Sequence, residues 1–383
     1  MSSFIVASAL SCALGSSLQK SVENLRDGAI NLSSVALDNL EDPIEVPYFG
    51  IPNPDLLPTH ELMYRCVSGQ VESVIETLGL TTAERSRTGL FFGSSSFTVA
   101  DSEQQYFSEL ARNDVNALPM PIAGYNKFPE RIAAQFSLSA CVHSYATACT
   151  SSANALIYAD FLIALGEIDH AIVIGCEFKN TTTLLGFYGV ELLSPQRRML
   201  PFDRRRDGLI LGEACATLVL SKERKSNGLV FKGGACNTDT FSLTAANTDG
   251  SSITNVISDA LKASGCNAGD VSLIKVHGTA SLLSDEAESA GILRVFDKLP
   301  PILALKPYIG HTLGACGAVE LALLAGATIE GSFVPSNPGI AVADEGLGLT
   351  LLQDPLSPIK GHYLLNYFAF GGNNVSLVIE NAK

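Results

Sequence analysis

Three residues far apart in the sequence, Cys149, His277 and His311, have types and settings that suit thiol chemistry. Cys149 lies among small residues, which leave room for a substrate carbon to approach. A thiol at a helix N-terminus is favoured as the thiolate by the peptide dipoles, and imidazole is the usual partner of a nucleophilic thiol. Each residue alone also fits a structural role, as a buried cysteine or a hydrogen-bonded loop histidine. Together they indicate an activated thiol nucleophile.

The elements expected around these residues place all three at the ends of strands. Cys149 follows an apolar segment over 140–146 and precedes a helical pattern over 152–165. His277 ends a strand expected over 273–276, and His311 lies in a glycine-rich turn before a helix expected over 318–329. Because active sites of α/β sheets form at the carboxyl ends of strands, we expect the three side chains to converge.

Strands alternate with helices along the whole chain, which predicts a largely parallel, buried sheet. The chain then divides into two α/β halves, 1–222 with the nucleophile and 223–383 with the two histidines, joined by a linker over 222–228. Further short apolar runs and two more helical patterns fit this scheme; the expected strands are 4–9, 89–92, 171–174, 216–220, 229–231, 364–367 and 375–380, and the helices are one through Val22, Leu25 and Arg26 and one over 252–264. The fold class is therefore α/β.

Composition and charge exclude several classes of protein. The 383 residues are 46% hydrophobic and only 17% charged, whereas a disordered chain is polar and rich in charge. The formal net charge is −14, so binding to the phosphate backbone of nucleic acid is not expected. The same charge repels an acidic protein partner at long range.

Cysteine usage and the N-terminal segment indicate a cytoplasmic protein. The nine cysteines include no CxxC pair, which suits a reducing compartment better than a disulfide framework. Leu10-Ser11-Cys12 is weakly similar to a lipoprotein cleavage site, but no Lys or Arg precedes the apolar part as a signal peptide requires. Asp160 and Glu320 interrupt the longest apolar stretches, so no membrane span is expected.

Metal and nucleotide chemistry fit the sequence poorly. Cys141, His143 and Cys149 have a spacing that matches no common zinc pattern. The sequence has no P-loop, and the glycines near His311 do not follow a strand in dinucleotide-binding order. The arginine run 204–206, taken alone, is most simply a solvated loop. We therefore predict no metal and no cofactor.

Five segments together resemble the β-ketoacyl-acyl-carrier-protein synthases, the condensing enzymes of the thiolase superfamily. They occur in the family's order and at its spacing across nearly the whole chain; they are 147–151 (TACTS), 201–208 (PFDRRRDG), 277–279 (HGT), 306–320 (KPYIGHTLGACGAVE) and 370–372 (FGG). The resemblance implies a thiolase-like fold of five αβαβα layers with two similar halves. It also implies a dimer.

The resemblance assigns roles to the residues that match its motifs. Cys149 corresponds to the nucleophile that takes the acyl chain from a carrier protein. His277 and His311 correspond to the pair that promotes decarboxylation of the malonyl group. Lys306 and Glu320 correspond to residues that organise this polar network.

Other matching positions line the route of the substrate. Thr279 and Ser281 fall where the family hydrogen-bonds the pantetheine arm, and Phe370 corresponds to an aromatic gate beside the cysteine. The backbone N–H groups of Phe370 and Cys149 would form the oxyanion hole. Ser96 occupies a position where elongating synthases often have a bulkier residue in the acyl pocket.

The sequence departs from the family pattern at several of these places. Ser281 replaces a usual Thr, while Ala369 and Asn373 in the gate loop replace a usual Gly and Thr. Cys316 stands where the family has a small residue, and we interpret it as a packing residue. Docking of an acidic carrier protein needs a local basic patch, for which the candidates are Arg65, Lys127, Arg131 and Arg206.

The implied activity is a decarboxylating Claisen condensation. An acyl thioester on Cys149 reacts with malonyl-acyl-carrier protein to give 3-oxoacyl-acyl-carrier protein, in fatty-acid synthesis or in a type II polyketide or aryl polyene pathway. The implied partners are an acyl carrier protein with its phosphopantetheine arm and a second subunit, in a homodimer or a heterodimer. Two alternatives stay open: a non-catalytic chain-length partner of an active synthase, and a decarboxylase that loads starter units.

Overall fold

Ten strands form one mixed sheet in this computed structural model, which describes residues 3–38, 42–112, 124–224, 229–336 and 342–382. The strand order is β10-β9-β11-β12-β8-β1-β7-β6-β4-β5. The strands are β1 (Ser3–Ser11), β4 (Thr88–Gly93), β5 (Val142–Tyr145), β6 (His170–Glu177), β7 (Ala214–Ser221), β8 (Val230–Thr238), β9 (Val271–Lys275), β10 (Ile302–Leu303), β11 (Gly361–Phe368) and β12 (Asn373–Asn381). A separate hairpin pairs β2 (Ser33–Leu37) with β3 (Ile44–Tyr48).

The strand arrangement of the first half of the chain is repeated in the second. In the order β5-β4-β6-β7-β1, the first three strands are parallel, and the next two each run antiparallel to the strand before. The order β10-β9-β11-β12-β8 has the same pattern of directions. The two sets join where β1 pairs with β8 through Ser3–Phe231 and Phe4–Val230. Two similar α/β halves, as predicted, are therefore present in the fold. The prediction of a largely parallel sheet was wrong, because β12, β8, β1 and β7 pair antiparallel in the middle of the sheet.

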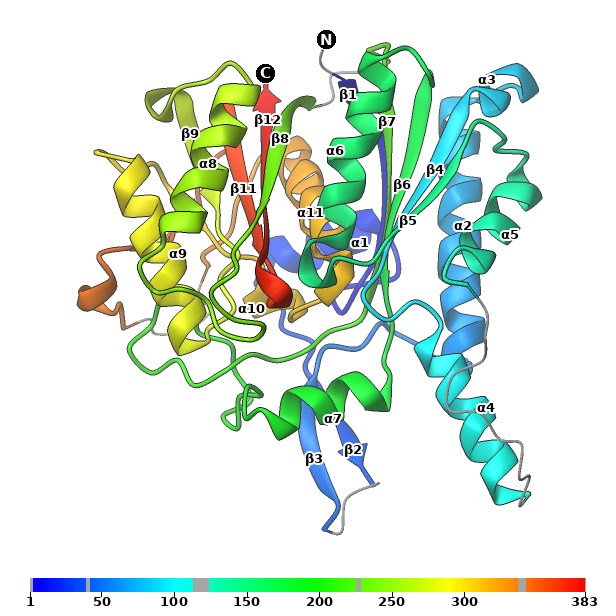
Figure 1. Cartoon of the computed structure of the whole chain (residues 1–383), viewed down its shortest axis with the longest axis horizontal. Coiled ribbons are helices and arrows are strands. Elements are labelled where there is room, and N and C mark those ends of the chain that lie inside the picture. Colours follow the sequence, from blue (N-terminus) through cyan, green and yellow to red (C-terminus); the bar gives the residue numbers. More distant parts are fainter. Residues whose placement is uncertain (1–2, 39–41, 113–123, 225–228, 337–341, 383) are drawn as a thin grey trace.

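Helices cover both outer faces of the sheet and fill the space between its halves (Figure 1). The helices are α1 (Leu18–Arg26), α2 (Thr59–Leu78), α3 (Thr82–Ser86), α4 (Val99–Ala111), α5 (Lys127–Phe136), α6 (Ser151–Ala164), α7 (Thr181–Gly189), α8 (Ser251–Ala263), α9 (Leu282–Val295), α10 (Lys306–Ile309) and α11 (Cys316–Glu330). One apolar cluster joins α2 and α5 to the first half, and another joins α8 and α9 to the second. With α6 and α11 between the halves, the layers are αβαβα.

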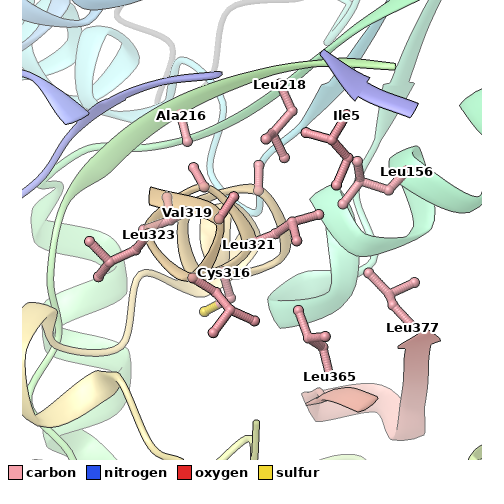
Figure 2. Packing of buried hydrophobic residues seen from close by; sticks show 14 of the residues in the cluster. Ile5, Leu156, Ala216, Leu218, Cys316, Val319, Leu321, Leu323, Leu365 and Leu377 are labelled. Atoms are coloured by element: carbon pink, nitrogen blue, oxygen red, sulfur yellow. The ribbon is translucent and has the colours of Figure 1, made fainter. Parts of the chain in front are cut away.

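The central layer accounts for the most apolar stretch of the sequence. In Figure 2, Val319 and Leu321 of α11 lie among Leu218 of β7, Leu156 of α6 and side chains of β11 and β12. A window over Leu313–Glu330 is long and apolar enough to cross a membrane, although the sequence prediction took Glu320 to interrupt it. Because 89% of this window is buried inside the protein, its composition is that of a core helix.

The repeated topology places two candidate residues at corresponding positions. Cys149 lies in a 3₁₀ turn, η1 (Ala148–Thr150), between β5 and α6. After β10 and α10, the equivalent turn η3 (Leu313–Ala315) begins just past His311 and leads into α11. Gly317 lets the two helices approach closely, because a Cβ there would lie 2.3 Å from the backbone nitrogen of Ala153. The absence of a side chain at Gly317 thus brings the two turns together.

Candidate active site

Cys149, His277 and His311 converge on one pocket at the junction of the two halves. The Cys149 Sγ lies 3.2 Å from His311 Nε2, and the two imidazole rings are 5.3 Å apart at an interplanar angle of 85°. All three residues line a cavity of about 330 Å³, together with Thr279 and Phe370. The arrangement therefore has a thiol and two ring nitrogens within reach of one small reacting group.

Backbone geometry presents Cys149 at the tip of a strained turn. Ala148 adopts φ +49°, a conformation that is costly for a residue with a Cβ and that recurs at functional sites. The backbone N–H of Phe370 donates a hydrogen bond to the Cys149 sulfur. Burial nevertheless raises the pKa of the Cys149 thiol far above its usual range, and Lys306 only partly offsets it. Burial therefore opposes the thiolate form that the position of Cys149 before a helix was predicted to favour.

Both histidines are held in the neutral form. Burial lowers the pKa of each imidazole well below its usual range, and the nearby Lys306 ammonium lowers it further. Lys306 Nζ lies 3.5 Å from His277 Nδ1 and donates to the His277 carbonyl at 2.7 Å. An ammonium can only donate, so His277 presents an unprotonated Nδ1 to Lys306 and an Nε2–H to the pocket.

Behind the histidines, one carboxylate is shared by two buried lysines. Glu320 accepts from Lys306 at 2.6 Å and from Lys275, which also donates to the carbonyl of Asn366 at 2.7 Å. The Lys275 ammonium lies 3.6 Å from the centre of the Tyr367 ring. Burial lowers the pKa of Lys275 to about 8, whereas the Glu320 carboxylate keeps the pKa of Lys306 raised despite its burial. We call Lys275, Lys306 and Glu320 the buried charge cluster. Its two ammonium groups place positive charge near both histidines and so favour their neutral form.

We expect the Glu320→Gln variant to lose stability, because it leaves two buried ammonium groups without a counter-charge. Removing one partner of a buried ion pair typically costs about 3–5 kcal/mol, and urea unfolding measures this as a lower midpoint. Glu330→Gln is the matched control. Glu330 ends the same helix, but its side chain is 46% exposed and its ion pair with Arg26 is long, at 4.0 Å. Equal midpoints for the two variants would contradict a structural role for the cluster.

The pocket rim contains the residues assigned to the pantetheine arm and the gate. Thr279 and Ser281 line the pocket, with their hydroxyl oxygens 3.2 Å apart. The Phe370 ring stacks on Phe187 at 5.5 Å. The gate loop is also joined to the neighbouring loop, because the Gly371 N–H donates to the carbonyl of Leu243 at 2.8 Å.

No group of three or more His, Cys, Asp or Glu side chains is arranged to hold a metal ion within the described parts of the chain. His143, which the sequence places between two cysteines, instead stacks on Phe91 at 5.6 Å.

The family models for β-ketoacyl synthases match most of the chain. The N-terminal domain model matches residues 49–226, and the C-terminal domain model matches residues 229–339. The chain belongs to the β-ketoacyl synthase family. Its predicted resemblance is thereby confirmed, and the family supports a condensing enzyme.

Curated relatives of this β-ketoacyl synthase family member are 26–29% identical to it over the segments that align. The 3-oxoacyl-[acyl-carrier-protein] synthase 2 of Mycobacterium leprae is 29% identical over 276 residues, which cover 67% of this chain and 66% of that protein. The protein of the same name from Vibrio cholerae is 26% identical and covers 80% of this chain and 79% of that protein.

Solved structures confirm the thiolase-like fold of the family. A chain from the complex of a ketosynthase with its chain length factor, from Xenorhabdus doucetiae, superposes with a TM-score of 0.82 at 25% identity, covering 99% of this chain and 98% of that chain. A β-ketoacyl synthase from Burkholderia phymatum superposes over all of both chains with a TM-score of 0.85 at 23% identity.

Two residues that the resemblance placed at the substrate or carrier surface lie elsewhere. Ser96 does not line the described pocket, because its backbone N–H and hydroxyl are both bonded to Glu177. Arg206 is not a free docking residue: its side chain is 6% exposed and lies 2.6 Å from Asp344 and 3.9 Å from Asp285. Both interpretations are corrected by the contacts that bury these side chains.

The other three docking candidates are exposed but lie away from the pocket lining. Arg65 is on α2 and forms an ion pair with Asp55 at 2.8 Å. Lys127 and Arg131 are exposed on α5, and the Arg131 guanidinium lies 4.5 Å from the centre of the Tyr64 ring. In Figure 1, α2 and α5 lie on the flank opposite α8 and α9.

Three buried acidic or basic residues were missed by the sequence prediction. Glu177, at the end of β6, accepts from the N–H groups of Ser95 and Gly314 and so ties the loop after β4 to the turn η3. Glu288 accepts from the N–H groups of His277 and Gly278 at 2.7 and 2.9 Å. Lys275 is the third. For Glu177 and Lys275 the available signal was a charged residue inside or at the end of an apolar strand, as in 271–276 (VSLIKV), whereas Glu288 lies within helix α9 and has no such signal.

Proposed function

We propose that this chain catalyses a decarboxylating Claisen condensation as an acyltransferase of the 3-oxoacyl-acyl-carrier-protein synthase type. The observation that supports this proposal most strongly is the contact of Cys149 with His311, beside a second neutral imidazole, in a pocket large enough for a thioester. Its substrates are an acyl thioester and malonyl-acyl-carrier protein, and its product is a 3-oxoacyl thioester that is longer by two carbons.

In the first half-reaction, the Cys149 sulfur attacks the acyl carbonyl. Because burial keeps Cys149 as a thiol, its proton must be taken up as the sulfur attacks, and His311 Nε2 lies 3.2 Å away. The proton then goes to the departing pantetheine sulfur. The carbonyl oxygen gains negative charge, which the backbone N–H groups of Cys149 and Phe370 would stabilise by several kcal/mol.

In the second half-reaction, loss of carbon dioxide from the malonyl thioester leaves an enolate. Two neutral imidazoles that donate Nε2–H to its oxygen stabilise the enolate without supplying a proton acidic enough to quench it. The enolate carbon attacks the acyl-Cys149 thioester, and Cys149 leaves as the thiolate, which takes up one proton from water to restore the thiol. Holding both thioesters in one pocket supplies much of the rate acceleration.

The proposed macromolecular partners are an acyl carrier protein and a second ketosynthase-like subunit. The net charge of −14 opposes an acidic carrier protein, so docking requires exposed cations, and Arg65, Lys127 and Arg131 stay the candidates. A soluble biosynthetic role in the cytoplasm is proposed with them.

The subunit interface is proposed at β5, which ends the ten-stranded sheet within the described residues. An edge strand offers unpaired backbone groups for pairing with another chain. Beside it, Tyr158 and Phe161 of α6 and Leu165, which follows the helix directly, are exposed; Phe161 is 51% exposed and Leu165 58% exposed. Such an apolar patch next to a free edge suits a subunit interface. Two copies of this chain or a chain-length partner would fit it equally.

Reaction of the purified chain with hexanoyl- and malonyl-acyl-carrier protein tests the proposal. We expect a carrier protein whose pantetheine arm has the mass of the 3-oxooctanoyl group, detected by intact-protein mass spectrometry. If the chain is instead a starter-loading decarboxylase, acetyl-carrier protein forms without a ketone product. Absence of both products, with and without a chain-length partner from the same host, would point to a non-catalytic subunit and contradict the proposal.

A further inference from the structure

A second buried thiol, that of Cys316, contacts Nδ1 of His311. Cys316 Sγ lies 3.2 Å from His311 Nδ1, on the side of the ring opposite Cys149, whose Sγ lies 3.2 Å from Nε2. The Thr312 hydroxyl donates to the Cys316 sulfur at 3.5 Å. Cys316 is fully buried and does not line the pocket, so it is not placed to act as a second nucleophile. The interpretation of Cys316 as a packing residue is therefore incomplete.

The partners of the two histidines differ in the direction of hydrogen bonding they permit. Lys306 beside His277 is an ammonium, which donates only and so fixes the Nε2–H tautomer. A thiol has one hydrogen and sulfur lone pairs, so it can donate to an unprotonated Nδ1 or accept from Nδ1–H. Rotation of the S–H bond changes one arrangement into the other without moving the ring.

The proposed reaction requires opposite tautomers of His311 in its two halves. Attack by Cys149 needs an unprotonated Nε2 to take up the thiol proton, which places the ring proton on Nδ1 beside Cys316. Enolate stabilisation needs Nε2–H, which leaves Nδ1 unprotonated beside Cys316. Between the two half-reactions, one proton leaves Nδ1 and one binds Nε2 by exchange with water in the pocket, so no further reactant is needed.

We propose that Cys316 is a positioning residue that supports both tautomers of His311, while Lys306 holds His277 in one. This inference rests on the proposed function for its kinetic consequence, but not for its structural content. It explains why position 316 has a side chain that can both donate a hydrogen bond to His311 Nδ1 and accept one from it, where helix packing alone would favour a small apolar residue.

Two substitutions at Cys316 separate this role from simple packing. In Cys316→Ala, His311 Nδ1 has no hydrogen-bond partner. A buried Nδ1–H without an acceptor costs more free energy than a buried, unprotonated Nδ1 without a donor. The ring is then held as Nε2–H, which cannot accept the Cys149 proton. We expect acylation of Cys149 to slow by about tenfold or more, the equivalent of one hydrogen bond, with malonyl decarboxylation nearly unchanged. Cys316→Ser keeps a two-way partner and should retain both rates.

The tautomers are measured directly by long-range ¹H–¹⁵N spectra of protein labelled at its six histidines, with the His311 signal assigned from His311→Gln. We expect both tautomers for His311 in the unliganded protein, and Nε2–H alone in Cys316→Ala and for His277. Cys12→Ala, which removes another fully buried thiol, controls for packing and should leave the spectrum unchanged.

A single His311 tautomer in the wild-type protein would overturn the inference, as would a Cys316→Ser variant as impaired in acylation as Cys316→Ala. Because the spectra require no turnover, they also distinguish the two proposals. If the expected tautomers are seen but no condensation product forms, the proposed function fails and the role of Cys316 stands.

Discussion

Replacing Cys149 by alanine is expected to abolish condensation while leaving decarboxylation of malonyl-acyl-carrier protein measurable. Among the described residues that line the pocket, Cys149 is the only cysteine, and Cys316 is fully buried outside that lining. Loss of a nucleophile typically lowers turnover by about 10⁴-fold or more. The two imidazoles and their lysine stay in place, so the group that stabilises the enolate is intact. The variant should therefore release acetyl-carrier protein.

Mass spectrometry of the protein after incubation with acyl-carrier protein measures the first part of this expectation. Wild-type protein should gain the mass of one acyl group, which peptide mapping places on Cys149, and Cys149→Ala should gain none. Cys266→Ala is a suitable control, because Cys266 is a buried free thiol that does not line the pocket. An acyl adduct or 3-oxoacyl product from Cys149→Ala would refute the assignment of the nucleophile.

Motif positions predicted that Cys149, His277 and His311 converge, because all three lie at the ends of strands or in the turns that follow them. Cys149, His277 and His311 were each assigned from a strand or turn boundary, and the structure brings them together. The strands themselves were visible as apolar runs. The exceptions were the hairpin strands β2 and β3, which were not predicted, and β10, whose two residues, Ile302 and Leu303, are too few to give a pattern.

The sequence could not predict which charged residues and thiols contact one another in the interior of the protein. Arg206 was interpreted as exposed because nothing nearby in the chain shows Asp344 beneath it. The pKa of Cys149 was predicted from its helix alone, whereas burial by residues from both halves decides its direction. Lys275 was passed over for the same reason, since it acquires its partners Glu320 and Asn366 only through the packing of β9 against α11 and β11. Cys316 was interpreted as a packing residue, although its partners His311 and Thr312 lie only five and four residues before it in the chain.

The two histidines should separate the half-reactions when each is replaced by alanine. His277→Ala is expected to lower malonyl decarboxylation by about 10²–10³-fold, the effect of losing one preorganised donor to a developing oxyanion. Acylation of Cys149 should persist, because the ring of His277 is not the one in contact with the thiol. His311→Ala should impair both steps. His362→Ala, on the distant end of β11, is the control. Equal loss of acylation in His277→Ala and His311→Ala would contradict this division.

The pH dependence of decarboxylation gives an independent measure of the same two rings. An ordinary imidazole, with a pKa near 6.5, would be half protonated at that pH. Because burial and Lys306 lower the pKa of both histidines well below this value, they stay neutral on mild acidification. We expect the rate to be level between about pH 8 and 6. The unfolded chain binds protons at these histidines first, so stability falls as the pH drops below about 6.5. A rate that halves near pH 6.5, with stability unchanged, would show that the imidazoles titrate as exposed groups.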